Sequence, residues 1–383
     1  MLNKRLVLSA IVLCFGFSTA QAQNLKSDLA KDLALGLQVL FNNSLSEEQV
    51  QEKITKTLET KSNYQKLVAG FDPSDPSTVK WKKAKMNLQE FEFQSPVQNP
   101  GSKANTVYGY LYTPDVHPGC DFKFPGTLLV QHVDDDIGPQ KTMALEAARL
   151  GNGVSMIIFL PEYGPRKNGS DPTAPPFNGK LADFKRDIFQ SLVDLRVSYE
   201  ILKRAQYVDP NQMQIGGLSL GAALTATMAG FDPVFNKYLI GLGGGDYGAV
   251  MTSYNNRDDA KGAIAWALKK VKHWKAEDVR EALFDLDAFT WAYNIRNRDI
   301  TIIAAKDDEI FNYENNVMKL ATIYEKNGNK VRIKSHDGEH VPDKKELGLG
   351  GALKVYWKVL TTILGFIGES QSANLASCKA QFN

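Results

Sequence analysis

A serine enclosed by glycines places the strongest constraint on this sequence. Gly217, Ser219 and Gly221 form a G-x-S-x-G pattern, which is typical of a nucleophilic serine on a tight turn from a strand to a helix. The turn strains the serine backbone, so the residues two before and two after it must be small. It also exposes the hydroxyl at a helix N-terminus, where the Leu220 amide is free to face a developing oxyanion. The pattern therefore predicts Ser219 as nucleophile and the Leu220 amide as oxyanion donor.

The surrounding residues decide whether this pattern is more than an ordinary glycine-rich turn. Before it, Met213 and Ile215 alternate with glutamines as they would in a strand. After it, residues 220–230 are small or apolar and end in glycine, which is typical of a buried helix. Strand, serine turn and helix are the context that the pattern requires.

The first 22 residues are typical of a signal peptide. Lys4 and Arg5 precede an apolar run over 6–17, and an A-x-A site ends at Ala22, where we expect cleavage. About a dozen apolar residues are too few for a membrane anchor. Cys14 suggests a lipoprotein, but Leu13 is a poor residue to precede a lipidated cysteine. We expect an exported protein, periplasmic or secreted, without a membrane span.

The composition, with 43% hydrophobic and 23% charged residues, is that of an ordinary globular protein. Of its 45 basic and 43 acidic side chains, only two basic ones lie within residues 1–22, so the rest of the chain carries equal numbers. This balance gives no indication of nucleic acid or an anionic membrane as a partner. Cys120 and Cys378 could form one disulfide that ties the C-terminal tail to the body, or remain two buried thiols. No cysteine or histidine spacing indicates a metal site, and no cofactor is expected.

The chain up to residue 112 is expected to carry a helical extension and the edge of a sheet. Over 23–84, leucines recur at helical spacing, and Ser46–Gln49 resembles a capping box at the start of a second helix. Strand-like runs follow at 85–93 and 106–112. Their aromatic content indicates an antiparallel pair at a sheet edge.

From residue 127 onward, strands alternate with helices. Near-continuous apolar strands, as at 154–160, are expected where helices cover both faces of a parallel sheet. The alternation predicts an α/β fold with one doubly wound, mostly parallel sheet within a domain at 85–368. Residues 161–180 are expected to form a long surface loop near the site, and 247–298 a helical cap insertion. Residues 369–383 would form a C-terminal tail.

The nucleophile needs a base and an acid, which follow it in the order serine, acid, histidine in this arrangement. Two of the five histidines, His336 and His340, lie beyond the last predicted strand. His340 is the candidate base because its glycine-bearing loop would let it reach back over the sheet. His336 lies nearer the strand end and is interpreted as structural. Taken alone, either histidine would be interpreted as a hydrogen-bonded structural residue.

The acid is expected directly after the strand at 300–305. The segment there offers Asp307, Asp308 and Glu309. Such loops commonly place an aliphatic residue three positions after the acid, which selects Asp307 through Ile310. Asp308 is the second candidate, and at least one of the three acids is expected to lie in a solvated turn.

Ser219, Asp307 and His340, in this order and on these strands and helices, resemble the α/β-hydrolase superfamily. The segments QIGGLSLGAAL and DAFTWAYNIRNRDITIIAAKDD are most similar to the branch with acetyl-xylan-esterase-like, dienelactone-hydrolase-like and prolyl-oligopeptidase-like hydrolases. The similarity covers roughly residues 85–367. It implies a second oxyanion donor in the loop after His132, where Val133 stands in place of the usual glycine. We expect the amide of Val133, or that of Asp134, to donate, and His132 to be structural.

The resemblance implies an exported serine hydrolase that acts on a small-molecule carboxylic ester. A serine nucleophile, rather than a cysteine, argues against dienelactone-type chemistry. One alternative is a serine peptidase of the prolyl-oligopeptidase kind, although no propeller-length segment precedes the domain. Another is a non-catalytic protein that binds a ligand or partner through the cap. The sequence does not indicate an oligomeric state.

Overall fold

The computed structural model describes residues 19–75, 77–85, 87–133, 137–169, 179–253, 255, 271–340 and 357–381. The predicted signal peptide up to residue 18, with Cys14, lies outside these ranges. So do Asp134, residues 170–178 of the predicted loop at 161–180, and residues 254 and 256–270 of the predicted cap. Across the ranges given above, no helix has the length and apolar character needed to cross a membrane.

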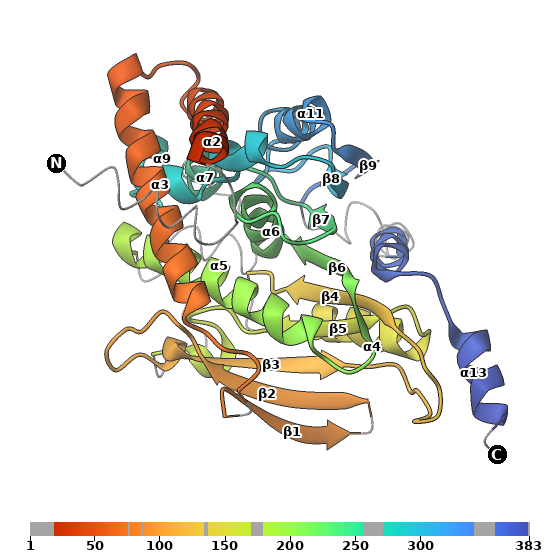
Figure 1. The fold of residues 1–383 in the computed structure, drawn as a ribbon. Coiled ribbons are helices and arrows are strands. Elements are labelled where there is room, and N and C mark those ends of the chain that lie inside the picture. Colours follow the sequence, from red (N-terminus) through yellow and green to blue (C-terminus); the bar gives the residue numbers. More distant parts are fainter. Residues whose placement is uncertain are drawn as a thin grey trace.

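One sheet runs through the centre of the molecule, with strand order β1-β2-β3-β5-β4-β6-β7-β8-β9 (Figure 1). All neighbours from β5 to β9 are parallel, whereas β1, β2 and β3 are antiparallel, and β3 also pairs antiparallel with β5. The predicted mostly parallel sheet and its antiparallel edge are therefore confirmed, and β1 extends that edge. The strands are β1 Val79–Lys85, β2 Leu88–Gln94, β3 Thr106–Tyr112, β4 Phe124–Val130, β5 Val154–Ile158, β6 Val208–Leu218, β7 Lys237–Gly241, β8 Asp299–Ala305 and β9 Lys330–His336.

Helices cover both faces of the sheet, which explains why the central strands are apolar throughout. Alternate residues of β4 point to opposite faces: Leu128 belongs to one buried cluster and Leu129 to the other. The first cluster contains the helices α5, α6 and α11, and the second contains α4 and a helix at 357–367. These helices are α4 Gly138–Arg149, α5 Leu181–Lys203, α6 Leu220–Phe231 and α11 Lys319–Lys326, preceded by a π-helical segment η5 Tyr313–Met318. Short 3-10 turns lie at η1 Lys103–Asn105 and η2 Gly164–Arg166.

Two helices at the N-terminal side pack on the helical layer beside α5 and α6 (Figure 1). They are α2 Thr19–Leu40 and α3 Glu47–Ala69, and Ser46 and Gln49 form the predicted capping box at the start of α3. A Cβ on Gly36 would lie 2.3 Å from the carbonyl oxygen of Thr290, so α2 lies directly on the segment after β7. The hydroxyl of Tyr64 on α3 donates to Asp232 at 2.6 Å.

The described parts of 247–298 are helical and precede β8. They are α7 Tyr247–Thr252, α9 Ala276–Leu283, η3 Phe284–Leu286, α10 Ala288–Trp291 and η4 Ala292–Asn294. At the other end of the chain, α13 Ser372–Ala380 is tied to the body by a disulfide between Cys120 and Cys378. The sequence left open whether these two cysteines form a disulfide or remain thiols, and in the structure they form the disulfide.

Candidate active site

Ser219 lies at the sharp turn between β6 and α6, with φ 54° and ψ −118°. A positive φ is unfavourable for a residue with a side chain, so the surrounding packing must hold it. A Cβ on Gly217 would lie 2.3 Å from the backbone carbon of Gly221, so the two glycines of the pattern touch each other. The need for small residues on both sides of the serine is therefore a direct steric consequence of the turn.

The start of α6 also lies against the end of β4. A Cβ on Gly221 would lie 2.6 Å from the carbonyl oxygen of Val130 and 2.7 Å from that of Gln131. This close approach brings the loop after β4, with Val133, to the same end of the sheet as Ser219. As the first residue of α6, Leu220 has an amide without an acceptor in its own helix.

His340 lies beside Ser219, although the two residues are 121 positions apart in the chain. Its Nε2 is 2.9 Å from the Ser219 hydroxyl, and its Nδ1 is 2.8 Å from Oδ2 of Asp308. A carboxylate can only accept, so Nδ1 carries the proton, and the unprotonated Nε2 of the neutral ring accepts from the serine hydroxyl. The His340 amide donates to Glu309 at 3.0 Å, and the ring stacks on Phe311. His340 is 2% exposed and Ser219 9%, so water has little access to these hydrogen bonds.

The acid beside His340 is Asp308, and the choice of Asp307 was wrong. Asp307 is exposed, and its carboxylate accepts from the amide of Gly338 at 2.9 Å. The amide of Lys306 donates to the carbonyl of His336, the last residue of β9, and the amide of Asp307 donates to that of Gly338 just beyond it. These two residues therefore continue the edge of the sheet, and Asp308 is the first whose side chain turns inward. Its other oxygen accepts from the amides of Ile310 and Phe311 at 2.9 and 2.8 Å, which fixes the carboxylate.

The other histidines near this end of the sheet do not take part in this chain of hydrogen bonds. Nδ1 of His132 is 3.0 Å from the amide nitrogen of Gln140 on α4. Nδ1 of His336 is 3.0 Å from the carbonyl oxygen of Asp337. Val133 is partly buried against the core, and Asp134 is outside the described ranges.

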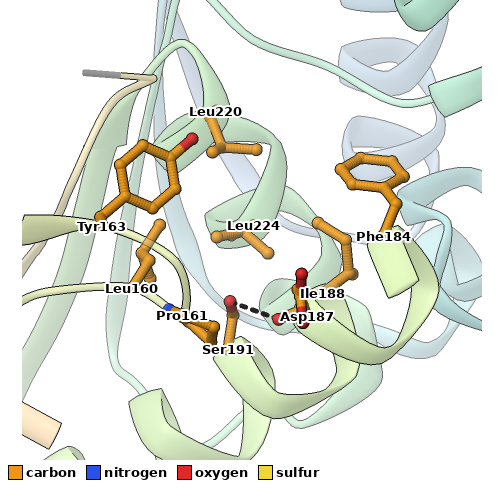
Figure 2. A pocket seen from close by; sticks show the side chains of 9 residues that line it. All are labelled: Leu160, Pro161, Tyr163, Phe184, Asp187, Ile188, Ser191, Leu220 and Leu224. Carbon is orange, nitrogen blue, oxygen red and sulfur yellow. Dashed lines mark hydrogen bonds between the residues drawn. The ribbon is translucent and has the colours of Figure 1, made fainter. Parts of the chain in front are cut away.

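A cavity opens beside the turn between β6 and α6 that carries Ser219, called the elbow below (Figure 2). The sequence did not indicate this cavity. Its empty volume is about 290 Å³, part of which is open to solvent. It is formed by α5, the start of α6 and the loop after β5, and its lining residues are Leu160, Pro161, Tyr163, Phe184, Asp187, Ile188, Ser191, Leu220 and Leu224. Residues from three separate segments meet there, so no local sequence pattern could have predicted it.

Asp187 is the ionisable carboxylate in this lining. Burial raises its pKa to about 6, with Arg186 opposing the shift and the neighbouring Glu162 and Asp183 contributing to it. Among the residues described by the structure, no group of three or more histidine, cysteine or acidic side chains could hold a metal ion.

The fold is similar to solved structures, although no protein-family model and no curated protein matches the sequence. Acetyl xylan esterase 1 from Thermoanaerobacterium sp. JW/SL YS485 aligns with a TM-score of 0.54 and 15% identity over 78% of this chain and 93% of the esterase. An acetyl xylan esterase from Paenibacillus sp. R4 aligns with a TM-score of 0.51 and 13% identity over 79% of this chain and 92% of that one.

Pyrococcus horikoshii acylaminoacyl peptidase aligns with a TM-score of 0.52 and 16% identity over 76% of this chain but 41% of the peptidase. These proteins are α/β-hydrolases, and the chain shares their fold, which confirms the predicted fold class. At such low identity the similarity shows the fold alone.

Proposed function

We propose that this chain is an exported serine hydrolase that acts on small carboxylic esters. The observation that carries the proposal is the continuous chain of hydrogen bonds from Ser219 through His340 to Asp308, with distances of 2.9 and 2.8 Å. Nucleophile, base and orienting acid in this order form the arrangement that activates a serine hydroxyl.

In the proposed reaction, the Ser219 hydroxyl attacks the ester carbonyl carbon while Nε2 of His340 takes its proton. Asp308 holds the proton on Nδ1 and stabilises the imidazolium that forms. The amides of Leu220 and Val133 donate to the oxyanion of the tetrahedral intermediate. His340 then gives its proton to the leaving alcohol, which leaves an acyl-enzyme. Water activated by His340 releases the acid and restores Ser219.

Two observations favour an ester over a peptide bond as the substrate. The chain spans more than nine-tenths of the two acetyl xylan esterases but 41% of the acylaminoacyl peptidase. The cavity beside the elbow is small and largely apolar, which suits one substituent of a small ester better than an extended peptide.

Export is proposed from two features, the N-terminal sequence and the disulfide. The signal-like sequence predicts cleavage after Ala22. The disulfide between Cys120 and Cys378 suits an oxidising compartment. N-terminal sequencing of the protein from a periplasmic or culture fraction would test this, and an intact N-terminus retained in the cytoplasm would contradict it.

The activity is tested by turnover of short-chain p-nitrophenyl esters and of p-nitroanilide peptides by the protein from residue 23. We expect ester hydrolysis that is lost in Ser219→Ala, with much slower amide hydrolysis. Faster amide hydrolysis would favour the peptidase. A folded wild-type protein that neither hydrolyses esters nor reacts with a fluorophosphonate would favour the non-catalytic binding protein.

A further inference from the structure

The cavity beside the elbow shares Leu220 with the proposed oxyanion site. Leu220 contributes its side chain to the cavity wall, and its amide is the proposed oxyanion donor next to Ser219. A carbonyl group whose oxygen faces this amide therefore lies close to the cavity wall.

The walls of this cavity are mostly apolar. Leu160, Ile188 and Leu224 supply aliphatic surface, and Phe184 adds an aromatic ring from the start of α5 (Figure 2). Such walls favour carbon groups over water. The cavity is small, so it suits one substituent rather than a whole substrate.

Asp187 adds a negative charge to this apolar surface. Its Oδ1 accepts from Arg186, from Nε at 3.1 Å and from a terminal nitrogen at 3.0 Å. Arg186 also bonds to Asp183 at 2.6 Å, so its charge is shared between two carboxylates. Oδ2 of Asp187 has no hydrogen-bond partner among the residues that the structure describes.

Charged groups of both signs act on Asp187 at the cavity wall. Glu162 and Asp183 act on it as like charges, and Arg186 acts on it as a cation whose hydrogen bonds are divided between Asp183 and Asp187. A second cation would reduce the repulsion among these carboxylates, whereas another carboxylate would increase it.

We propose that this cavity, the Asp187 pocket, binds a substrate substituent with an apolar body and an amine at its end. The substituent's carbons lie against Leu224, Ile188 and Phe184, and its ammonium group donates to Oδ2 of Asp187. The pocket therefore selects cationic esters over neutral ones of the same size and disfavours esters that end in a carboxylate. This inference rests on the proposed ester hydrolysis.

The test compares esters whose acyl or alcohol group ends in a neutral, a cationic or an anionic group. The acyl series is p-nitrophenyl butyrate, 3-aminopropanoate and hemiadipate; the alcohol series is the acetate esters of pentanol and 4-aminobutanol. We expect kcat/KM for the cationic member to exceed that of its neutral counterpart by about tenfold or more in one series, as a charge-assisted hydrogen bond allows. The series with the preference identifies the substituent that enters the pocket.

Two variants assign the preference to Asp187. Asp187→Asn should remove the preference, so that kcat/KM for the cationic ester falls to that for its neutral counterpart. Asp183→Asn is the matched control, since it removes a carboxylate from Arg186 without changing the cavity wall, and it should retain most of the preference. Thermal unfolding checks that each variant is folded, and Asp187→Ser replaces Asp187→Asn if that protein is not.

Two results would overturn the inference while the proposed function stands. One is hydrolysis of neutral esters with no cationic preference in either series. The other is a preference that survives in Asp187→Asn. If no ester is hydrolysed and Ser219 is not labelled by a fluorophosphonate, the proposed function fails and the Asp187 pocket fails with it.

Discussion

Oδ2 of Asp308 lies 2.8 Å from Nδ1 of His340, while Asp307, its neighbour in sequence, is exposed and bonds to the main chain of Gly338. The two carboxylates are adjacent in the chain but face different surroundings. Asp308 can orient the imidazole of His340, whereas Asp307 accepts a hydrogen bond from the loop after β9.

This difference predicts opposite results for two isosteric substitutions. Asp308→Asn should lower kcat by about 10⁴-fold, because the amide favours the wrong tautomer of His340. Asp307→Asn should leave kcat within a few-fold of wild type. Ester hydrolysis by the two purified variants checks this, and a larger loss in Asp307→Asn would return the role to Asp307.

The contacts of the elbow glycines predict a loss of stability on adding a methyl group. Gly217→Ala and Gly221→Ala each place a Cβ within 2.6 Å of backbone atoms, so each should cost about 1–3 kcal/mol or more and lower activity. Gly365→Ala is the control, because Gly365 is exposed in a helix and a Cβ added there would have no neighbouring atom within 4 Å. It should be neutral or stabilising by about 0.5–1 kcal/mol. Urea unfolding measures all three, and equal stabilities would contradict the steric account.

The buried carboxylate of Asp287 predicts a pH dependence of stability. Burial raises its pKa from 3.8 to about 6, with Asp246 as a further cause. Between these two values the folded protein keeps a proton that the unfolded chain releases, so the free energy of unfolding falls as pH rises. Above pH 6 both states are ionised and the cost is constant at about 3 kcal/mol.

Asp287→Asn removes this titration. The free energy of unfolding of wild type minus that of Asp287→Asn should therefore fall by up to about 3 kcal/mol between pH 4 and pH 7. Urea unfolding at four pH values measures the difference. A difference that rises with pH, or stays constant, would show that Asp287 does not titrate in this way.

The ion pair of Arg166 and Asp194 lies under the loop that forms one wall of the Asp187 pocket. Both side chains are fully buried and 2.7 Å apart, and Arg166 also donates to the carbonyls of Ala104 and Phe159. Arg166→Met should destabilise the protein by about 3–5 kcal/mol, because it leaves the Asp194 charge buried without its partner. The double variant Arg166→Met with Asp194→Leu should lose less. A double variant less stable than the single one would contradict this explanation.

The elbow could be predicted from sequence because its information is local. Ten consecutive residues contain the strand end, the glycines, the serine and the helix start, and each constrains the next. The strands were predictable for a similar reason: β5 and β8 are apolar throughout because helices cover both faces.

The information that distinguishes Asp308 from Asp307 is not contained in the local sequence. The distinction depends on how far the main chain after β8 continues to bond to the end of β9 and the loop after it, about 30 residues later. The Asp187 pocket is likewise formed by α5, α6 and the loop after β5, which meet only in the folded protein. Sequence patterns describe one element at a time, so they selected Ser219 and His340, which the structure brings together, but did not select Asp308 over Asp307 and did not indicate the pocket.

Mapping of a fluorophosphonate adduct by mass spectrometry tests the activation of Ser219 by His340 and Asp308 most directly. The account predicts one adduct, on Ser219, that is absent from Ser219→Ala and forms several orders of magnitude more slowly in Asp308→Asn. An adduct on another residue, or equally fast labelling of Asp308→Asn, would contradict it.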